Sequence, residues 1–228
     1  MARPFGAADP ASLRADMVER QLRRRGITDE RVLAAMEAVP RERFVPERYR
    51  RRAYADSALP IGYEQTISQP WIVAAICQAL ALDGSERVLE IGTGSGYSAA
   101  VLALLAREVI TIERVEELAA AARGTLAELG VENVEVLVGD GSAGLPDRAP
   151  FEAIAVHATA PAPPATLIEQ LTVGGRLVVP IASHTADMLT AFIRRAADVD
   201  ATTGQGLEQV VIGPCRFVPL IGSEGFPG

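Results

Sequence analysis

The chain has 228 residues, of which 49% are hydrophobic and 22% are charged, and its formal net charge at pH 7 is −7. This composition is typical of an ordinary globular domain and excludes a disordered, fibrous or coiled-coil protein. A chain of this length can build a core without a metal or a disulfide. Its two cysteines, Cys77 and Cys215, are too far apart for a CxxC motif, which predicts buried thiols in a reducing cytoplasm.

Charge and hydropathy narrow the classes of partner. No apolar run approaches the roughly 20 residues that a spanning helix needs, and no signal-peptide region is visible, so we expect a cytoplasmic protein without a membrane partner. Residues 14–52 carry 12 arginines against 7 acidic residues, whereas residues 53–228 carry 9 arginines against 21. We interpret the basic segment as a solvated helical face, with steering of a carboxylate-bearing partner as the alternative. The acidic remainder argues against a nucleic-acid partner.

The first part of the chain predicts a helical cap over about residues 13–83. Apolar residues at helical spacing predict helices over 13–25, ended by Gly26, and over 29–38, before Pro40. Residues 59–62 have the composition of a loop, and helical spacing resumes over 71–82, behind Pro70.

From about residue 84 to 222, short apolar runs alternate with helical segments. The runs predict strands over 88–91, 109–112, 134–138, 153–156, 177–181, 189–193, 208–212 and 217–220, and helices over 97–106, 115–129 and 163–171. Together they predict an α/β fold, a doubly wound, mostly parallel Rossmann-like sheet with an N-terminal helical cap, in a single domain spanning residues 1–228. Such sheets bind ligands beyond the carboxyl ends of their strands.

A glycine-rich turn follows the first of these core strands. Gly92, Gly94 and Gly96 open the next helix and allow a ligand to approach the backbone at a helix N-terminus, which predicts a nucleoside cofactor. Glu113 closes the next strand, 21 residues after Gly92, where a carboxylate can accept hydrogen bonds from both ribose hydroxyls. The dinucleotide fingerprint would need glycine where the chain has Tyr97, so NAD is disfavoured.

A GxGxG turn preceded by an acidic residue resembles motif I of the Rossmann-like S-adenosylmethionine methyltransferases. The resemblance implies that the cofactor contacts are Glu90, Gly92, Thr93, Gly94, Ser95 and Gly96, together with Glu113. Asp140 and Gly141, after the third strand, fall where that superfamily places a residue against the adenine.

Residues 59–70, with the sequence Leu-Pro-Ile-Gly-Tyr-Glu-Gln-Thr-Ile-Ser-Gln-Pro, closely resemble the signature of the protein-L-isoaspartate O-methyltransferase family. The resemblance continues through residues 39–46, 149–154, 174–180 and 216–220. It implies a monomeric repair enzyme without a metal, which methylates the free α-carboxylate of L-isoaspartyl residues in damaged proteins and peptides and leaves S-adenosyl-L-homocysteine. An enzyme of the same fold that esterifies normal aspartate in a dedicated peptide precursor remains the alternative.

The same resemblance assigns residues to the acceptor side. Ser68 matches the active-site serine, and Gln65, Thr66, Ile67 and Ser68 are expected to contact the cofactor. The expected isoaspartyl pocket consists of Ile67, Ser68, Gln69, His157, Ala158 and Val218. His157 departs from the family pattern, and residues 183–188 lack the glutamine expected near there.

The chemistry agrees with these residues. A carboxylate has an ordinary pKa of about 4 and is already an anion at neutral pH, so the acceptor needs no general base. The two histidines, His157 and His184, are interpreted as loop or strand-end residues. The enzyme must supply orientation and partial desolvation, and Ser68 precedes a predicted helix whose dipole favours a carboxylate.

Two other classes are disfavoured. The intact Thr66–Ser68 loop argues against a module that binds the cofactor without turnover. A nucleic-acid methyltransferase is disfavoured because the residues after the fourth strand lack an Asn/Asp-Pro-Pro-aromatic motif.

Overall fold

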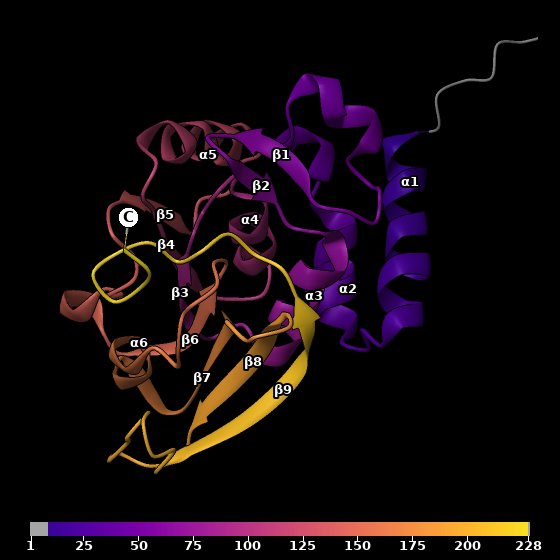
Figure 1. Cartoon of the computed structure of the whole chain (residues 1–228). Coiled ribbons are helices and arrows are strands. Elements are labelled where there is room, and N and C mark those ends of the chain that lie inside the picture. Colours follow the sequence, from indigo (N-terminus) through magenta and orange to yellow (C-terminus); the bar gives the residue numbers. More distant parts are fainter. Residues whose placement is uncertain (1–8, 228) are drawn as a thin grey trace, which may run out of the picture.

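The computed structural model describes residues 9–227 and is built around a seven-stranded sheet (Figure 1). The strand order is β5-β4-β3-β6-β7-β8-β9. The strands are β3 (Arg87–Ile91), β4 (Glu108–Glu113), β5 (Val134–Val138), β6 (Phe151–Val156), β7 (Leu171–Ile181), β8 (Asp187–Arg194) and β9 (Leu207–Cys215). The first five strands of this order pair in parallel, and β8 and β9 add antiparallel pairs. The predicted mostly parallel α/β sheet is therefore confirmed.

Alternating side chains bury both faces of the sheet, as a doubly wound fold requires. Val88 and Val109 belong to one apolar cluster, whereas their neighbours Leu89 and Ile110 belong to a second. The first cluster includes side chains of the helices α3 (Pro70–Leu80), α4 (Tyr97–Ala103) and α5 (Glu116–Glu128), and the second includes those of α6 (Ala165–Glu169). Residues of the cap, such as Met36, share the first cluster with the sheet.

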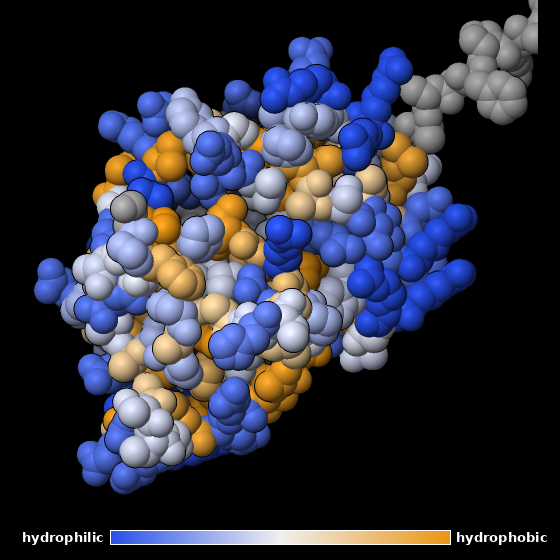
Figure 2. Space-filling view, viewed as in Figure 1, coloured by the Kyte–Doolittle hydropathy of each residue, from blue (hydrophilic) through white to orange (hydrophobic). Residues whose placement is uncertain are grey.

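The cap is a succession of short helical segments at the indigo end of Figure 1. They are α1 (Pro10–Met17), a π-helical turn (Val18–Leu22), a 3₁₀ turn (Arg23–Arg25), α2 (Glu30–Ala38) and two further 3₁₀ turns, Arg41–Phe44 and Glu47–Arg52. A hairpin of β1 (Leu59–Gly62) and β2 (Gln65–Ile67) connects the cap to α3. Figure 2 shows strongly hydrophilic side chains over the outer edge of the cap, as expected for a solvated helical face.

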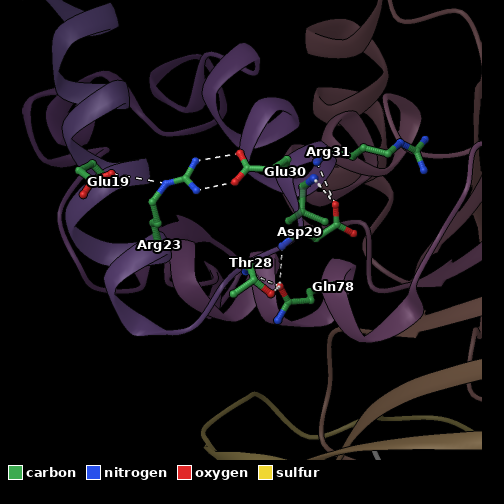
Figure 3. Close-up of polar contacts among 8 residues, drawn as sticks. Glu19, Arg23, Thr28, Asp29, Glu30, Arg31 and Gln78 are labelled. Carbon is green, nitrogen blue, oxygen red and sulfur yellow. Dashed lines mark hydrogen bonds and ion pairs between the residues drawn. The ribbon is translucent and has the colours of Figure 1, made fainter.

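Polar contacts fix the start of α2 within the cap (Figure 3). The Asp29 carboxylate caps this helix by accepting the backbone N–H groups of Arg31 and Val32, at 2.9 and 3.3 Å. Gln78 of α3 accepts the backbone N–H groups of Thr28 and Asp29 through its Oε1, at 2.7 and 3.0 Å. The two helices are therefore joined by hydrogen bonds as well as by apolar packing.

A second polar link lies at the start of β5. The side-chain nitrogen of Asn133 donates to the carbonyl oxygens of Ala103, Ala106 and Arg107, at 2.9, 3.3 and 3.4 Å. Its backbone carbonyl accepts the N–H of Val109 at the start of β4. One side chain thus satisfies the carbonyl of the last residue of α4, together with two carbonyls of the turn that follows the helix.

Several predicted boundaries were wrong for identifiable reasons. Residues 59–62 form a strand rather than a loop, because Leu59 and Pro60 pair with Ile67 and Thr66. The helix predicted over 163–171 is limited to α6, since β7 already begins at Leu171 and passes through an irregular stretch. Residues 217–220 form no regular strand, because Pro219 has no N–H to donate and only an isolated bridge to Thr159 remains.

The helix predicted over 13–25 is present but changes type twice before it ends. Gly26 adopts a φ of 90°, the left-handed conformation that ends helices. No helix within residues 9–227 is both long and apolar enough to cross a membrane.

Candidate active site

A deep cavity lies beyond the carboxyl ends of β3 and β6. These neighbouring strands are the switch point of the sheet, since the chain winds outward from β3 through β4 and β5 and then returns to β6. The cavity has a volume of about 650 Å³, which suits a cofactor-sized ligand. In the middle of the face shown in Figure 2, hydrophobic residues (orange) and more polar residues (white and blue) lie side by side at the surface.

Most of the residues predicted from the sequence line this one cavity. They are Gln65, Thr66, Ile67, Ser68, Gln69, Gly92, Thr93, Gly94, Ser95, Glu113, Gly141, His157, Ala158 and Val218. Glu90, Gly96 and Asp140 do not line it. Glu90 lies 3.2 Å from the lining residue His157, Gly96 donates its N–H to the carbonyl of the lining residue Thr93, and Asp140 lies between two lining glycines in the sequence. Six separate segments of the sequence therefore meet in one place.

The glycine loop, residues 92–96, turns directly from β3 into α4. Gly92 and Gly94 have φ values of 91° and 53°, which other residues adopt only with strain. Gly96 also has a positive φ, of 86°, and it serves packing as well, because a Cβ there would lie 3.1 Å from the Cβ of Ala122 on α5. The first two glycines thus shape the cavity wall, and the third brings α4 close to its neighbouring helix.

Glu113 ends β4 beside this loop and is 5% exposed. Its Oε2 accepts the N–H of Gly94 at 2.8 Å, and its Oε1 accepts the N–H of Val115 at 3.0 Å. Each carboxylate oxygen has a further lone pair, so Glu113 can also accept ligand hydroxyls. The carboxylate therefore fixes the glycine loop and remains available to a ribose.

A buried polar network supports the loop from below. Glu90, which is fully buried, accepts the hydroxyl of Thr111 at 2.6 Å, and the hydroxyls of Thr111 and Thr93 are 2.6 Å apart. His157 Nε2 lies 2.9 Å from the hydroxyl of Ser98 and 3.2 Å from Glu90 Oε1. The geometry at Glu90 Oε1 does not meet that of a hydrogen bond, so Ser98 is the better partner of the imidazole. Glu90 thus acts on the cavity through other side chains.

Asp140 is engaged by the C-terminal segment, residues 216–226, which crosses this side of the sheet in Figure 1. Its Oδ1 accepts the N–H of Ser142 and its Oδ2 that of Ser223, both at 2.8 Å. Burial alone would raise the pKa of Asp140, but these hydrogen bonds from Ser223 and Ser142 lower it below its ordinary value. Gly141 follows, where a Cβ would lie only 2.8 Å from Ile91.

The opposite wall is the acceptor loop, residues 63–69. Tyr63 and Glu64 turn the β1–β2 hairpin with φ values of 51° and 57°, the pair of positive angles typical of a tight two-residue turn. Ser68 follows β2 and is partly exposed. It is not the N-cap of α3, which is Gln69, so capping does not explain a serine at this position.

The sequence analysis missed several residues at the mouth of the cavity. Arg25 stacks over Trp71, with 5.1 Å between the guanidinium carbon and the ring centroid, and both of its contacts to Asp56 measure 3.1 Å. Gln69 donates to the same carboxylate at 2.6 Å. Trp71 and Phe217 adjoin recognised motifs and were open to prediction, whereas Arg25 reaches the cavity only through the tertiary fold.

A mostly parallel sheet, a GxGxG loop at its switch point and a carboxylate at the end of the adjacent strand together define a Rossmann-like methyltransferase. Comparison with known proteins narrows the class. A profile of the protein-L-isoaspartate(D-aspartate) O-methyltransferase family matches residues 13–225. The chain belongs to this family.

Individual relatives agree with the family profile. Protein-L-isoaspartate O-methyltransferase 2 of Marinobacter nauticus is 53% identical over 219 residues, covering 96% of this chain and 97% of that protein. The Methanoculleus marisnigri protein-L-isoaspartate O-methyltransferase is 49% identical over 222 residues, covering 97% of each. The fold also matches a Plasmodium falciparum protein-L-isoaspartate O-methyltransferase in complex with S-adenosyl-L-homocysteine, with a TM-score of 0.76 at 23% identity, covering 91% of this chain and 98% of that one.

Proposed function

We propose that this chain transfers a methyl group from S-adenosyl-L-methionine to the free α-carboxylate of L-isoaspartyl residues in damaged proteins and peptides. One observation carries the proposal: the acceptor loop with Ser68 and the glycine loop with Glu113 form two walls of a single cavity. Family membership supports the substrate class.

The residues present fit the cofactor. Gly92 and Gly94 leave bare backbone beside the cavity, and Glu113 presents a nearly buried carboxylate at its edge. We assign the ribose hydroxyls to Glu113 and the amino-acid end to the glycine loop with Thr93 and Ser95. We assign the adenine to the wall at Gly141, with Asp140 shaping that wall from behind. When bound, the cofactor supplies an electrophilic methyl group on a sulfonium centre.

On the acceptor side, we assign Ser68 to the reacting carboxylate. Its hydroxyl can donate a hydrogen bond to one carboxylate oxygen, while Gln65, Thr66, Ile67 and Gln69 line the path on either side of it. A hydrogen bond to a charged group contributes about 1.5–3 kcal/mol. Ala158, His157 and Val218 complete the wall opposite the loop.

The site orients its ligands and excludes water without moving a proton. The acceptor carboxylate is an anion at neutral pH, and opposite charges neutralise each other as the methyl group is transferred, so a partly desolvated site favours the reaction. Orientation alone can supply roughly 7–11 kcal/mol of barrier reduction in favourable cases. Glu90 and His157 accordingly hold the loops in place, and we assign them no proton transfer.

We further propose that the chain works as a monomeric, single-domain enzyme in the cytoplasm, without a nucleic-acid or membrane partner. Cys77 and Cys215 are both free thiols, as is usual in a reducing compartment. Within residues 53–228 acidic residues outnumber arginines, and this negative charge disfavours a polyanionic partner.

The test is methyl transfer from labelled S-adenosyl-L-methionine to one peptide made in isoaspartyl and aspartyl forms. Release of labelled methanol in alkali reports the methyl ester. We expect turnover of the isoaspartyl form and little of the aspartyl form. Preference for the aspartyl peptide would replace the repair substrate with a dedicated precursor, and cofactor binding without methanol release would contradict the enzyme assignment.

A further inference from the structure

Arg41 is the largest fully buried side chain of the described residues, although it carries a charge. It lies in the 3₁₀ turn Arg41–Phe44. Its Nε donates to the carbonyl of Ala53 and its Nη2 to the carbonyl of Ser68, both at 2.7 Å. Its guanidinium carbon lies 4.7 Å from the centroid of the Tyr97 ring, the first residue of α4.

The burial of the Arg41 guanidinium is poorly explained by a gain in the stability of the folded protein. Within residues 9–227, Nη1 of Arg41 has no hydrogen-bond partner, and no carboxylate forms an ion pair with this guanidinium. The adjacent Glu42 is instead bonded to Tyr54 and lies 3.9 Å from Arg14. A buried charge without a counterion costs several kcal/mol, and apolar replacements of buried ionic groups are often neutral or stabilising.

Burial also makes the Tyr97 phenol a neutral partner. It raises the pKa of Tyr97 to about 12, so the ring offers its face to the guanidinium without a negative charge. The contact to Tyr97 therefore orients Arg41 but does not neutralise it.

We propose that Arg41 is a positioning residue that fixes the Ser68 peptide group relative to α4, the helix that follows the glycine loop. Ser68 and Tyr97 both line the cavity, and Arg41, which does not line it, contacts both. The inference deepens the proposed function and rests on it, because Ser68 is the residue assigned to the acceptor carboxylate. A misplacement of about 1 Å can cost as much as a hundredfold in rate.

Arginine is required for this role by its shape. A planar guanidinium donates to two carbonyls while its face stacks on an aromatic ring. The ammonium group of a lysine can reach one of the carbonyls but cannot reproduce the stack. Arg41→Lys therefore keeps the charge and loses the geometry, whereas Arg41→Met loses both.

The experiment compares these variants with Arg31→Lys. Arg31 also donates to two backbone carbonyls, those of Leu82 and Leu105, but it lies outside the cavity, in the part of the cap drawn in Figure 3. We expect both Arg41 variants to bind S-adenosyl-L-homocysteine within about threefold of wild type and to lose at least about tenfold in kcat for the isoaspartyl peptide. Arg31→Lys should retain its kcat.

Two further measurements separate positioning from stability. Adding Arg41→Lys to Ser68→Ala should lower kcat little further, since both changes act through Ser68. Amide hydrogen exchange should accelerate over residues 66–69 in Arg41→Lys and remain unchanged in Arg31→Lys. The proposal would be overturned if the Arg41 variants kept the wild-type kcat and the wild-type hydrogen exchange of residues 66–69. It would also be overturned if the losses in kcat from Arg41→Lys and Ser68→Ala were fully additive, or if both Arg41 variants failed to fold. If the wild type showed no methyl transfer but Arg41→Lys still accelerated the hydrogen exchange of residues 66–69, the proposed function would be contradicted and the positioning role of Arg41 would stand.

Discussion

Ser68 and Glu113 lie on different walls of the cavity, and their replacement should affect different quantities, kcat for Ser68 and cofactor affinity for Glu113. Ser68→Ala removes a hydrogen bond to the reacting carboxylate, so we expect kcat to fall by about 10- to 100-fold while the affinity for S-adenosyl-L-homocysteine stays near wild type. Glu113→Ala should weaken that affinity and raise the KM for the cofactor. Steady-state kinetics and calorimetry measure the two effects. An unchanged kcat would remove Ser68 from the mechanism, and an unchanged affinity would refute the ribose role of Glu113.

Asp140 should make stability depend on pH in the acidic range. Hydrogen bonds from Ser223 and Ser142 lower its pKa in the folded state, so the folded protein binds fewer protons at this site than the unfolded chain. Its stabilisation is complete above the ordinary carboxyl pKa of about 3.9 and is lost as the pH falls below it. The Tm difference between wild type and Asp140→Asn should therefore be present at pH 7 and shrink below about pH 4.

The control for this measurement is Asp147→Asn, an exposed aspartate on the separate turn Pro146–Arg148, which removes the same charge. A Tm gap for Asp140→Asn that stays constant from pH 7 to pH 3 would contradict the role of its carboxylate.

Among the secondary-structure elements, α2 depends on a single cap. Asp29→Ala removes the acceptor of the N–H groups of Arg31 and Val32, and we expect the free energy of unfolding to fall by about 1 kcal/mol. For a chain of this size, that corresponds to roughly 2–4 °C in Tm. Asp16→Ala is the control, because the exposed Asp16 forms only a 3.5 Å pair with Arg20. Equal Tm changes in the two variants would show that the cap contributes nothing specific.

The elements that could be predicted are those whose local pattern agrees with their environment. Val88 and Val109 lie near the start of buried parallel strands, and continuous apolar runs marked these strands correctly. The edge strand β5, which begins at Val134, was also predicted, although Glu135 interrupts its apolar run and Val138 is exposed. The start of β7 was missed because Gly174 and Gly175 suggest a turn, whereas the chain passes them in an irregular strand beside β6. The β1 strand was missed because its pairing with β2 includes a proline, which sequence alone assigns to a loop.

The candidate site was predictable to the extent that its residues lie in contiguous motifs. The glycine loop, Glu113 and the acceptor loop each follow a recognisable pattern, and the fold brings them together. Arg25 carries no local signal, since arginines are frequent throughout the cap, and Arg41, although it lies in the recognised stretch 39–46, has nothing in its local sequence that marks it as buried. Their positions depend on packing between the cap and the core, which periodicity does not encode.

For the molecule as a whole, the C-terminal segment closes one side of the cavity, and its fit depends on Gly222. A Cβ at this position would collide with Asp140 Oδ1 and Ser142 Oγ, which are held by their own hydrogen bonds. Gly222→Ala should therefore displace residues 217–221, which line the cavity, and weaken S-adenosyl-L-homocysteine binding. The free energy of unfolding should fall by about 1–3 kcal/mol.

Gly213→Ala is the matched control, because a Cβ there would meet no atom within 4 Å. Calorimetric titration and thermal unfolding measure both variants. Wild-type affinity in a destabilised Gly222→Ala would show that the segment stabilises the fold without shaping the cavity.

Asn133 is the only asparagine in the chain. Deamidation requires the backbone nitrogen of the next residue to attack the side-chain amide and expel its nitrogen. Here three carbonyl oxygens hold that nitrogen, and the next residue, Val134, is β-branched and already paired in β5. The chain therefore offers deamidation a single asparagine, and that asparagine is held in a way that opposes the reaction.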